Sequence, residues 1–228
     1  MIGIIAAMDI ELGLLKRNIE DPRKRLISGT EFVSGTIYGK PVVAAVCGIG
    51  KVNAAVCAQS MILEYEPDCV INTGVAGALS GELKVFDVVA ATGAVQHDVD
   101  TTALGDAPGF VSTVNTIVFQ TNEALTNTLL GSIEGIGAHA VSGRVASGDQ
   151  FIDTSEDNKR ICEQFGAVAC EMEGGAIAQV CHLNQIPCAI LRAISDGADE
   201  GASMSYAAFA AKAAENSAKA LLDFIKGQ

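Results

Sequence analysis

The sequence has no tryptophan and few basic residues, with 15 Lys and Arg against 27 Asp and Glu and a formal net charge of −12. Proteins that bind nucleic acids or anionic membranes neutralise phosphate with patches of Lys and Arg, and the chain has no such patch. It also has no run of the ~20 apolar residues that a membrane-spanning helix needs. We therefore expect no nucleic-acid or membrane partner, and an apolar content of 49% excludes intrinsic disorder.

The cysteines show no sign of a disulfide framework or a zinc site. There are 7 of them, an odd number, none forms a C-x-x-C pair, and most lie in apolar runs, as Cys47 and Cys188 do. This pattern is typical of buried, reduced thiols. The N-terminal stretch MIGIIAAMDIELGLL has no basic start and carries Asp9 and Glu11 where a signal peptide needs apolar residues. These features predict a cytoplasmic protein.

Short apolar runs alternate with longer helical patterns along the whole chain. Strands are predicted at 2–7, 69–73, 87–96, 138–147, 167–172 and 187–195, with two more inside 30–48 that join at Tyr38–Pro41. Helices are predicted from Asp9 onward, at 51–65, near 120–131, and at 155–165, 175–184 and 205–226. Because no linker, repeat or low-complexity block interrupts the 228 residues, we expect one domain over 1–228. The predicted fold class is α/β, a three-layer α/β/α sandwich around a central mixed sheet.

Ligands of such folds bind beyond the carboxyl ends of the strands, and polar residues gather at one predicted end in particular. Arg192, Ser195 and Asp196 close the run PCAILRAISD. An arginine in that run is costly to bury unless a carboxylate pairs with it. The cluster is therefore either a structural ion pair with a capping turn or a ligand site, and its position favours the ligand site.

Two other groups of carboxylates give weaker signals. Glu171 and Glu173 stand two residues apart in an extended segment, so they point to the same side. The Gly174-Gly175 pair that follows indicates backbone passing close to a ligand or another strand, although an acidic first helical turn is an equal alternative. Glu11 lies on the opening turns of the first helix, where the helix dipole alone favours an acidic residue.

Several familiar sites are absent. The segment Asn72-Thr-Gly-Val-Ala-Gly77 is predicted as a glycine turn, and it matches neither the dinucleotide-binding nor the triphosphate-binding glycine motif. The three histidines, His97, His139 and His182, have no metal-ligand spacing, so we expect no metal site. No G-x-S-x-G elbow is present, which excludes the common serine-hydrolase arrangement.

Seven segments, in order, make the chain resemble the methylthioadenosine/S-adenosylhomocysteine nucleosidases of the nucleoside phosphorylase fold family. They are Met8-Asp-Ile-Glu11, GIGKVNAA (48–55), INTGVAGAL (71–79), HDVD (97–100), VASGDQFI (145–152), CEMEGGAIA (170–178) and LRAISDGAD (191–199). The resemblance covers nearly the whole length. It implies a nucleoside phosphorylase-like fold, a nucleoside substrate, a homodimer, and hydrolysis of the adenine–ribose bond of 5′-thio-substituted adenosines without a cofactor.

The resemblance also implies roles for the catalytic residues. Asp196 would protonate the purine at N7, Glu11 would hold and deprotonate the attacking water, and Glu173 would bind the ribose 2′- and 3′-hydroxyls. Arg192 would assist the water and the carboxylates, and Ser195 would position Asp196. These residue types suit glycosidic cleavage, which needs an acid at the leaving group and a carboxylate near the sugar. Burial would keep that acid protonated near neutral pH.

The same resemblance implies a substrate-binding set. Phe151 would stack on the purine, the backbone of Ile152 would read the purine edge, and Met172 would pack against the sugar. Gly77 belongs to this set as well.

Three features depart from the family pattern. Val75 stands where family members commonly have Ser, Tyr206 lines the 5′-substituent pocket where Phe is usual, and the segment 102–109 is shorter than the family loop that reaches the partner's 5′-pocket. They leave open a nucleosidase for another 5′ group, such as aminofutalosine, and a non-catalytic nucleoside-binding protein. A phosphorylase is less favoured, since the charge of Glu11 repels phosphate.

Overall fold

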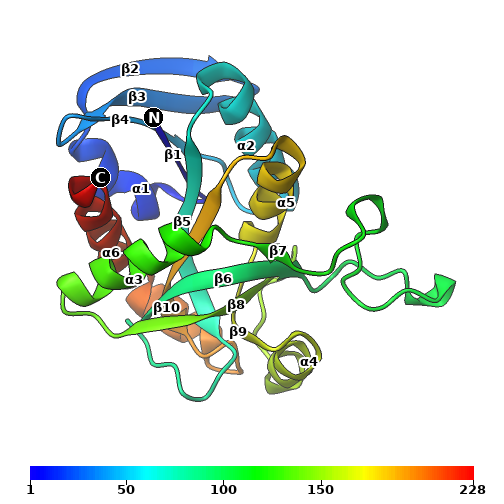
Figure 1. Cartoon of the computed structure of the whole chain (residues 1–228). Helices are drawn as coiled ribbons and strands as arrows, with labels where there is room; N and C mark the ends of the chain where they lie inside the picture. Colours follow the sequence, from blue (N-terminus) through cyan, green and yellow to red (C-terminus); the bar gives the residue numbers. More distant parts are fainter.

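The computed structural model describes residues 1–228 (Figure 1). Its elements in chain order are β1 (Ile2–Ala6), α1 (Asp9–Arg17), β2 (Glu20–Ile27), β3 (Thr30–Ile37), β4 (Lys40–Val46), α2 (Lys51–Tyr65), β5 (Cys69–Ala78), β6 (Val88–Gln96), 3₁₀ turns at Thr102–Leu104 and Ser112–Val114, β7 (Phe119–Gln120), α3 (Glu123–Gly135), β8 (Ala140–Ser147), α4 (Ser155–Phe165), β9 (Ala167–Glu171), α5 (Gly174–Asn184), β10 (Cys188–Asp196) and α6 (Ala202–Gly227).

All strands belong to one mixed sheet. The order is β10-β6-β8-β9-β5-β1-β4-β3-β2, with β7 beside β6. Because β10 pairs with β5 as well as with β6, the strands β5, β9, β8, β6 and β10 close into a ring, and β1, β4, β3 and β2 extend from it. Parallel pairs such as β1–β5 and β5–β10 occur together with antiparallel pairs such as β5–β9. The predicted mixed sheet is confirmed, and its closure into a ring is new information from the structure.

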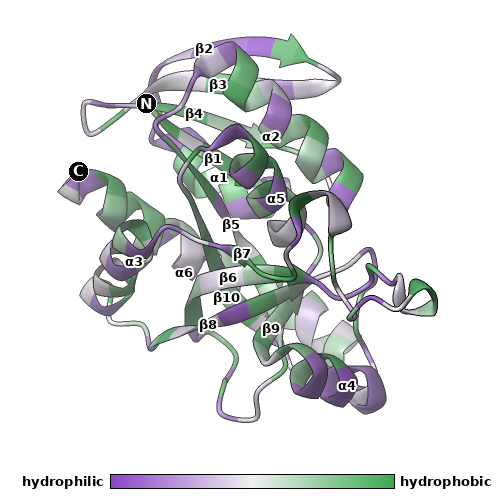
Figure 2. Ribbon diagram, turned by 45° about the vertical axis from the view of Figure 1, so that its right-hand side comes forward, coloured by the Kyte–Doolittle hydropathy of each residue, from purple (hydrophilic) through white to green (hydrophobic).

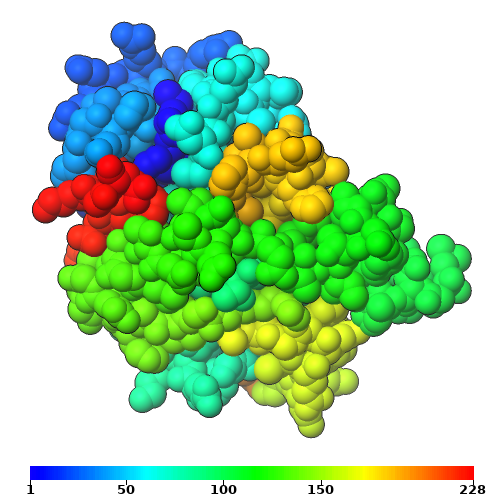
Figure 3. All heavy atoms as spheres, in the orientation of Figure 1, coloured from blue at the N-terminus to red at the C-terminus, as the bar shows by residue number.

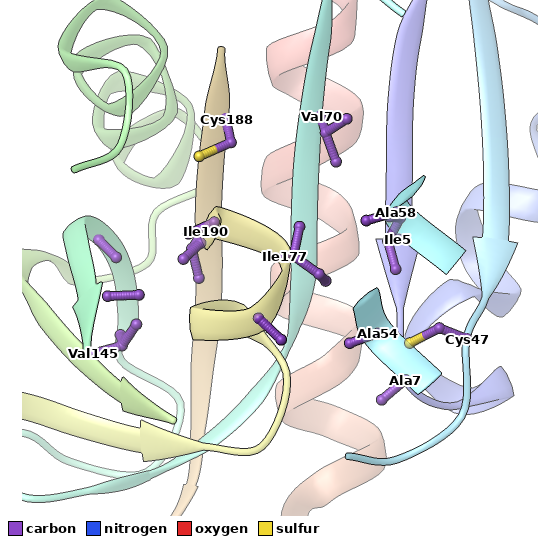
Figure 4. Packing of buried hydrophobic residues seen from close by; sticks show 14 of the residues in the cluster. Ile5, Ala7, Cys47, Ala54, Ala58, Val70, Val145, Ile177, Cys188 and Ile190 are labelled. Atoms are coloured by element: carbon purple, nitrogen blue, oxygen red, sulfur yellow. The ribbon is translucent and has the colours of Figure 1, made fainter. Parts of the chain in front are cut away.

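Helices cover both faces of the sheet, as predicted. A core cluster of 28 buried residues lies between the sheet and α2 and α5, where Ile177 of α5 and Ala54 of α2 face strand residues such as Ile5 and Ile190 (Figure 4). A second cluster of 24 buried residues packs α1, α3 and α6 against the opposite face. The helix α4 lies apart from both layers, beside β9, with a largely hydrophilic outer surface (Figure 2).

Most predicted elements are confirmed, but the predicted turn after strand 69–73 is wrong. β5 continues to Ala78, so Thr73–Gly77 is strand backbone, and its glycines have another purpose described below. The strand β2 was missed, because the sequence EDPRKRLI lacks apolar alternation. It forms the exposed edge of the sheet, and Pro22 lies where its register with β3 shifts, a position that does not require an N–H donor.

No helix has both the length and the apolar character needed to cross a membrane. All 7 cysteines are free thiols, and every one except Cys162 is buried.

Candidate active site

A cavity of about 360 Å³ opens at the carboxyl ends of several strands. It is lined by Ala7, Met8, Glu11, Ile49, Val75, Ala76, Gly77, Phe151, Cys170, Glu171, Met172, Glu173, Ser195, Asp196 and Tyr206. Every predicted site residue except Arg192 and Ile152 is in this lining. Segments that are far apart in the sequence therefore meet at the end of the sheet where the fold class places ligands.

Glu11 is held by backbone donors in the first turn of α1. Its Oε2 accepts hydrogen bonds from the amides of Ala7 at 3.0 Å and Met8 at 2.9 Å, and its Oε1 accepts one from the amide of Val75 at 3.0 Å. Burial raises the pKa of Glu11, against the opposing effect of the Arg192 charge and of these amides. The carboxylate is thus fixed in place and is a stronger base than an exposed glutamate.

Asp196 ends β10 and is held by its own neighbours in the chain. Its Oδ2 accepts a hydrogen bond from the Ser195 hydroxyl at 2.8 Å, and its Oδ1 accepts one from the amide of Ala198 at 3.0 Å. Burial raises the pKa of Asp196, although both hydrogen bonds oppose the shift. A carboxyl group with a raised pKa is suited to donate a proton near neutral pH.

Two glycines of β5 make room for these two carboxylates. A Cβ atom on Gly74 would lie 2.7 Å from Glu11 Oε1, and one on Gly77 would lie 2.7 Å from Asp196 Oδ1. No side chain fits at such distances without displacing the carboxylate. The two glycines of β5 therefore leave the space that the carboxylates of Glu11 and Asp196 occupy against the strand.

Glu173 comes from the junction of β9 and α5. Its Oε1 accepts a hydrogen bond from the amide of Gly50, in the turn between β4 and α2, at 2.8 Å. Burial and the nearby Glu171 carboxylate raise the pKa of Glu173, against the charge of Arg192. The close backbone approach predicted from Gly174-Gly175 is confirmed, because a Cβ atom on Gly175 would lie 3.0 Å from Ser147 of β8, and the predicted helix begins at Gly174.

Arg192 lies beneath the cavity and pairs with Glu171. Both side chains are 1% exposed, and Nη2 of the arginine is 2.5 Å from Oε2 of the glutamate. Nη2 also donates to the Asn72 side chain. Burial alone would raise the pKa of Glu171, but the Arg192 charge and the Ser147 hydroxyl hold it below its usual range. The arginine thus has the carboxylate partner that its burial requires, and that partner is the one carboxylate of the Glu171/Glu173 pair to which the sequence analysis assigned no role.

Aromatic and sulfur-containing side chains form the mouth of the cavity. Phe151 is 46% exposed, and its ring meets that of Tyr206 edge to face with centroids 5.7 Å apart. The Tyr206 hydroxyl lies 3.0 Å from Sδ of Met8. The side chain of Ile152 points away into a small core cluster, which leaves only its backbone for the predicted contact with a purine.

Comparisons with known proteins identify the family of the chain. The model of the phosphorylase superfamily matches residues 1–226. The 5′-methylthioadenosine/S-adenosylhomocysteine nucleosidase of Shewanella sediminis is 38% identical over 219 residues, which are 95% of each protein. The chain belongs to this nucleosidase family of the phosphorylase superfamily.

Solved structures of the nucleosidase family have nearly the same fold. The Neisseria meningitidis 5′-methylthioadenosine/S-adenosylhomocysteine nucleosidase, in complex with methylthio-immucillin-A, is 41% identical, with a TM-score of 0.96 over 100% of this chain and 99% of its own. The futalosine hydrolase of Helicobacter pylori is 36% identical, with a TM-score of 0.95 over 100% and 97% of the two chains.

The sequence pointed to the carboxylates of the site but missed part of its lining. Met8 and Ile49 lie inside the segments that carry the nucleosidase resemblance, so those segments were the available signal. Ala76 and Cys170 lie inside these segments as well, whereas Ala7 lies outside them, and only the three-dimensional arrangement places it at the cavity.

Proposed function

We propose that the protein hydrolyses the N-glycosidic bond of 5′-methylthioadenosine and S-adenosylhomocysteine, releasing adenine and the 5-thio-substituted ribose. The observation that carries the proposal is the gathering of Glu11, Glu173 and Asp196 in one cavity, each with a raised pKa. Family membership supplies the substrate class.

The roles of the three acids follow from the needs of the reaction. Protonated Asp196 gives its proton to N7 of the purine, and the electrons of the breaking bond between C1′ and N9 move into the ring. Positive charge then develops on the sugar, and a water held by Glu11 adds to C1′ while Glu11 takes its proton. Glu173, whose second carboxylate oxygen has no protein donor, binds the ribose hydroxyls. Arg192 acts through its charge from below the cavity.

Water is favoured over phosphate as the nucleophile. No Lys, Arg or His side chain lines the cavity, whereas Glu11, Glu171, Glu173 and Asp196 do. A phosphate in that position would meet negative charge without a basic partner, because the guanidinium of Arg192 is already committed to Glu171.

Hydrolysis of aminofutalosine is a second candidate, favoured by one observation. The Helicobacter pylori futalosine hydrolase matches this chain as closely in fold as the methylthioadenosine nucleosidases do. The adenine and ribose contacts would be shared, so the choice depends on the 5′ end, where Tyr206 replaces the usual Phe.

We further propose that the protein works as a homodimer in a reducing, cytoplasmic compartment, as its free thiols suggest. Val52, Val56 and Leu63 form an exposed apolar stripe on α2, and Val52 is 74% exposed. The segment 97–118 protrudes from the body, with Leu104 83% exposed (Figures 1 and 3). Burying both surfaces against a second copy would remove this apolar area from water. In analytical ultracentrifugation we expect the wild type to sediment with twice the mass of one chain. V52D should sediment with the mass of a single chain.

One panel of substrates tests the reaction. Adenine release is measured from 5′-methylthioadenosine, S-adenosylhomocysteine, aminofutalosine and inosine, with and without phosphate. We expect fast release from the first two at a rate independent of phosphate. Faster release from aminofutalosine would establish the second candidate, and no release from any substrate would contradict both and favour a binding protein.

A further inference from the structure

Glu173 has a single protein hydrogen-bond donor, and that donor comes from a turn distant in the sequence. The amide of Gly50 reaches Glu173 Oε1 at 2.8 Å, 123 residues away along the chain. Glu173 stands at the N-terminus of α5 but makes no side-chain capping bond there. The orientation of this carboxylate therefore depends on where the Gly50 amide is held.

Gly50 has a backbone conformation that needs outside support. Its φ of 98° and ψ of 160° lie in a region that is essentially restricted to glycine. A Cβ atom there would also lie 3.0 Å from Asp149 Oδ1. Neighbouring Ile49 is 53% exposed, so apolar packing does little to hold the turn.

A closed ring of polar contacts holds the residue that follows Gly50. The Lys51 amide donates to Asp149 Oδ1 at 2.7 Å, the Asp149 amide donates to Asp98 Oδ2 at 2.9 Å, and Lys51 Nζ returns to Asp98 Oδ1 at 2.6 Å. Lys51 Nζ also donates to Gln96 Oε1 at 3.2 Å. The ring joins the segments after β4, β6 and β8, which all end at the cavity side of the sheet.

The ion pair in this ring is well shielded from solvent. The side chains of Lys51 and Asp98 are 16% and 21% exposed, whereas most other ion pairs of the chain lie on open surface. A shielded pair with charge-assisted hydrogen bonds is worth more than an exposed one. Removing the lysine side chain would leave Asp98 without its counter-ion and open the ring, so that the turn before α2 would be held by the Lys51 amide bond to Asp149 and by the bond from Asn53 Nδ2 to the Ile49 carbonyl oxygen.

We propose that Lys51 is a positioning residue for Glu173, because the ring it closes with Asp98 and Asp149 holds the Gly50 amide against the Glu173 carboxylate. The inference rests on the proposed function for its catalytic consequence. If Glu173 binds the ribose hydroxyls, loss of the ring weakens recognition of the sugar and leaves recognition of adenine unchanged.

The kinetic test compares K51M with K51R and with K159M, which removes an exposed lysine from the pair with Glu163. For K51M we expect kcat/KM on 5′-methylthioadenosine to fall about ten- to hundredfold, the scale of one lost charge-assisted hydrogen bond. The inhibition constant of adenine, which lacks the ribose, should stay within about twofold. K51R should recover most of the loss, and K159M should match the wild type. Equal losses for substrate and adenine would overturn the proposal.

A second measurement needs no turnover, so it separates this inference from the proposed function. The amide proton shift of Gly50, followed by NMR against pH, should report ionisation of Glu173 and lose that response in E173Q. In K51M the response should vanish or move to higher pH, because Glu173 loses its donor; an unchanged response would overturn the proposal. The other titratable or charged groups that act on Glu173 or feel its charge are Glu171, Arg192, Glu11, Cys47 and Tyr206.

Discussion

Gly77 of β5 lies directly opposite Asp196 of β10, and a Cβ atom on Gly77 would stand 2.7 Å from Asp196 Oδ1. The same added atom would lie 2.9 Å from the Cβ of Ala198, whose amide holds the carboxylate. The glycine therefore sets the position of the proposed acid although it has no side chain.

We expect G77A to lose activity while the fold remains. The added methyl group displaces Asp196 and Ala198, and misplacement of a proton donor typically costs about 10²-fold or more in rate. The measurement is kcat/KM for adenine release, together with circular dichroism. G81A is the matched control, because no atom lies within 4 Å of a Cβ built there. Equal activity of the two variants would refute the proposed position of the acid.

D196N tests the acid itself. The amide keeps the size of the carboxyl but is far too weak an acid to transfer a proton to the purine, so turnover should fall by about 10²–10⁴ or more. Stability should not fall. Burial raises the pKa of Asp196, so the ionised carboxylate destabilises the folded state at neutral pH, and a neutral side chain removes that cost. A variant with near-wild-type turnover, or one that unfolds at a clearly lower temperature, would contradict the assignment.

The pH dependence of stability should report the raised pKa of Glu173. The unfolded chain has an ordinary glutamate pKa of about 4.3. The folded state, with its higher pKa, is favoured below that value and loses this advantage as pH rises through the folded-state pKa. Between pH 5 and pH 8 the wild type should lose more unfolding free energy than E173Q, by about 1.4 kcal/mol for each pH unit between 5 and the folded-state pKa of about 7. Urea denaturation at both pH values measures this, and parallel profiles would show that the pKa is not raised.

Removing one partner of the Arg192–Glu171 ion pair should lower the unfolding free energy much more than replacing both partners by neutral side chains. R192M leaves Glu171 buried and unpaired, which we expect to cost about 3–5 kcal/mol of unfolding free energy. Adding E171Q should restore much of that stability, because no buried charge remains. Urea denaturation of both single variants and the double variant measures the coupling. If the losses simply add, the pair has no energetic role.

The sequence predicted the fold and drew attention to Asp196 because those signals are local, whereas Glu11 and Glu173 received their roles from the family resemblance. Continuous apolar runs identified the buried strands, and Asp196 stood out at the end of such a run. What it missed depends on contacts between distant segments. Gly74 and Gly77 looked like a turn because glycine is common in turns, and only the partner strand shows why they lie in β5. The sequence predicted that a buried Arg192 needs a carboxylate partner. It did not identify Glu171 as that partner, because several carboxylates were available.

Asn158 of α4 connects the end of β5 to the residue after the proposed acid. Its Nδ2 donates to the carbonyl oxygens of Ala78 at 2.9 Å and Gly197 at 3.0 Å. N158D keeps the shape but turns a double donor into an anion facing two carbonyl oxygens, so the backbone after Asp196 should move away. We expect kcat for adenine release to fall about tenfold or more.

N216D is the matched control for this change, because Asn216 of α6 is half-buried and bonds a single carbonyl oxygen, that of Phe86, at 3.5 Å. Its kcat should equal that of the wild type. If N158D also keeps wild-type kcat, the carboxyl of Asp196 is held by Ser195 and Ala198 alone. If kcat of N158D falls while its far-ultraviolet circular dichroism is unchanged, the bonds from Asn158 of α4 help to hold Asp196 in position.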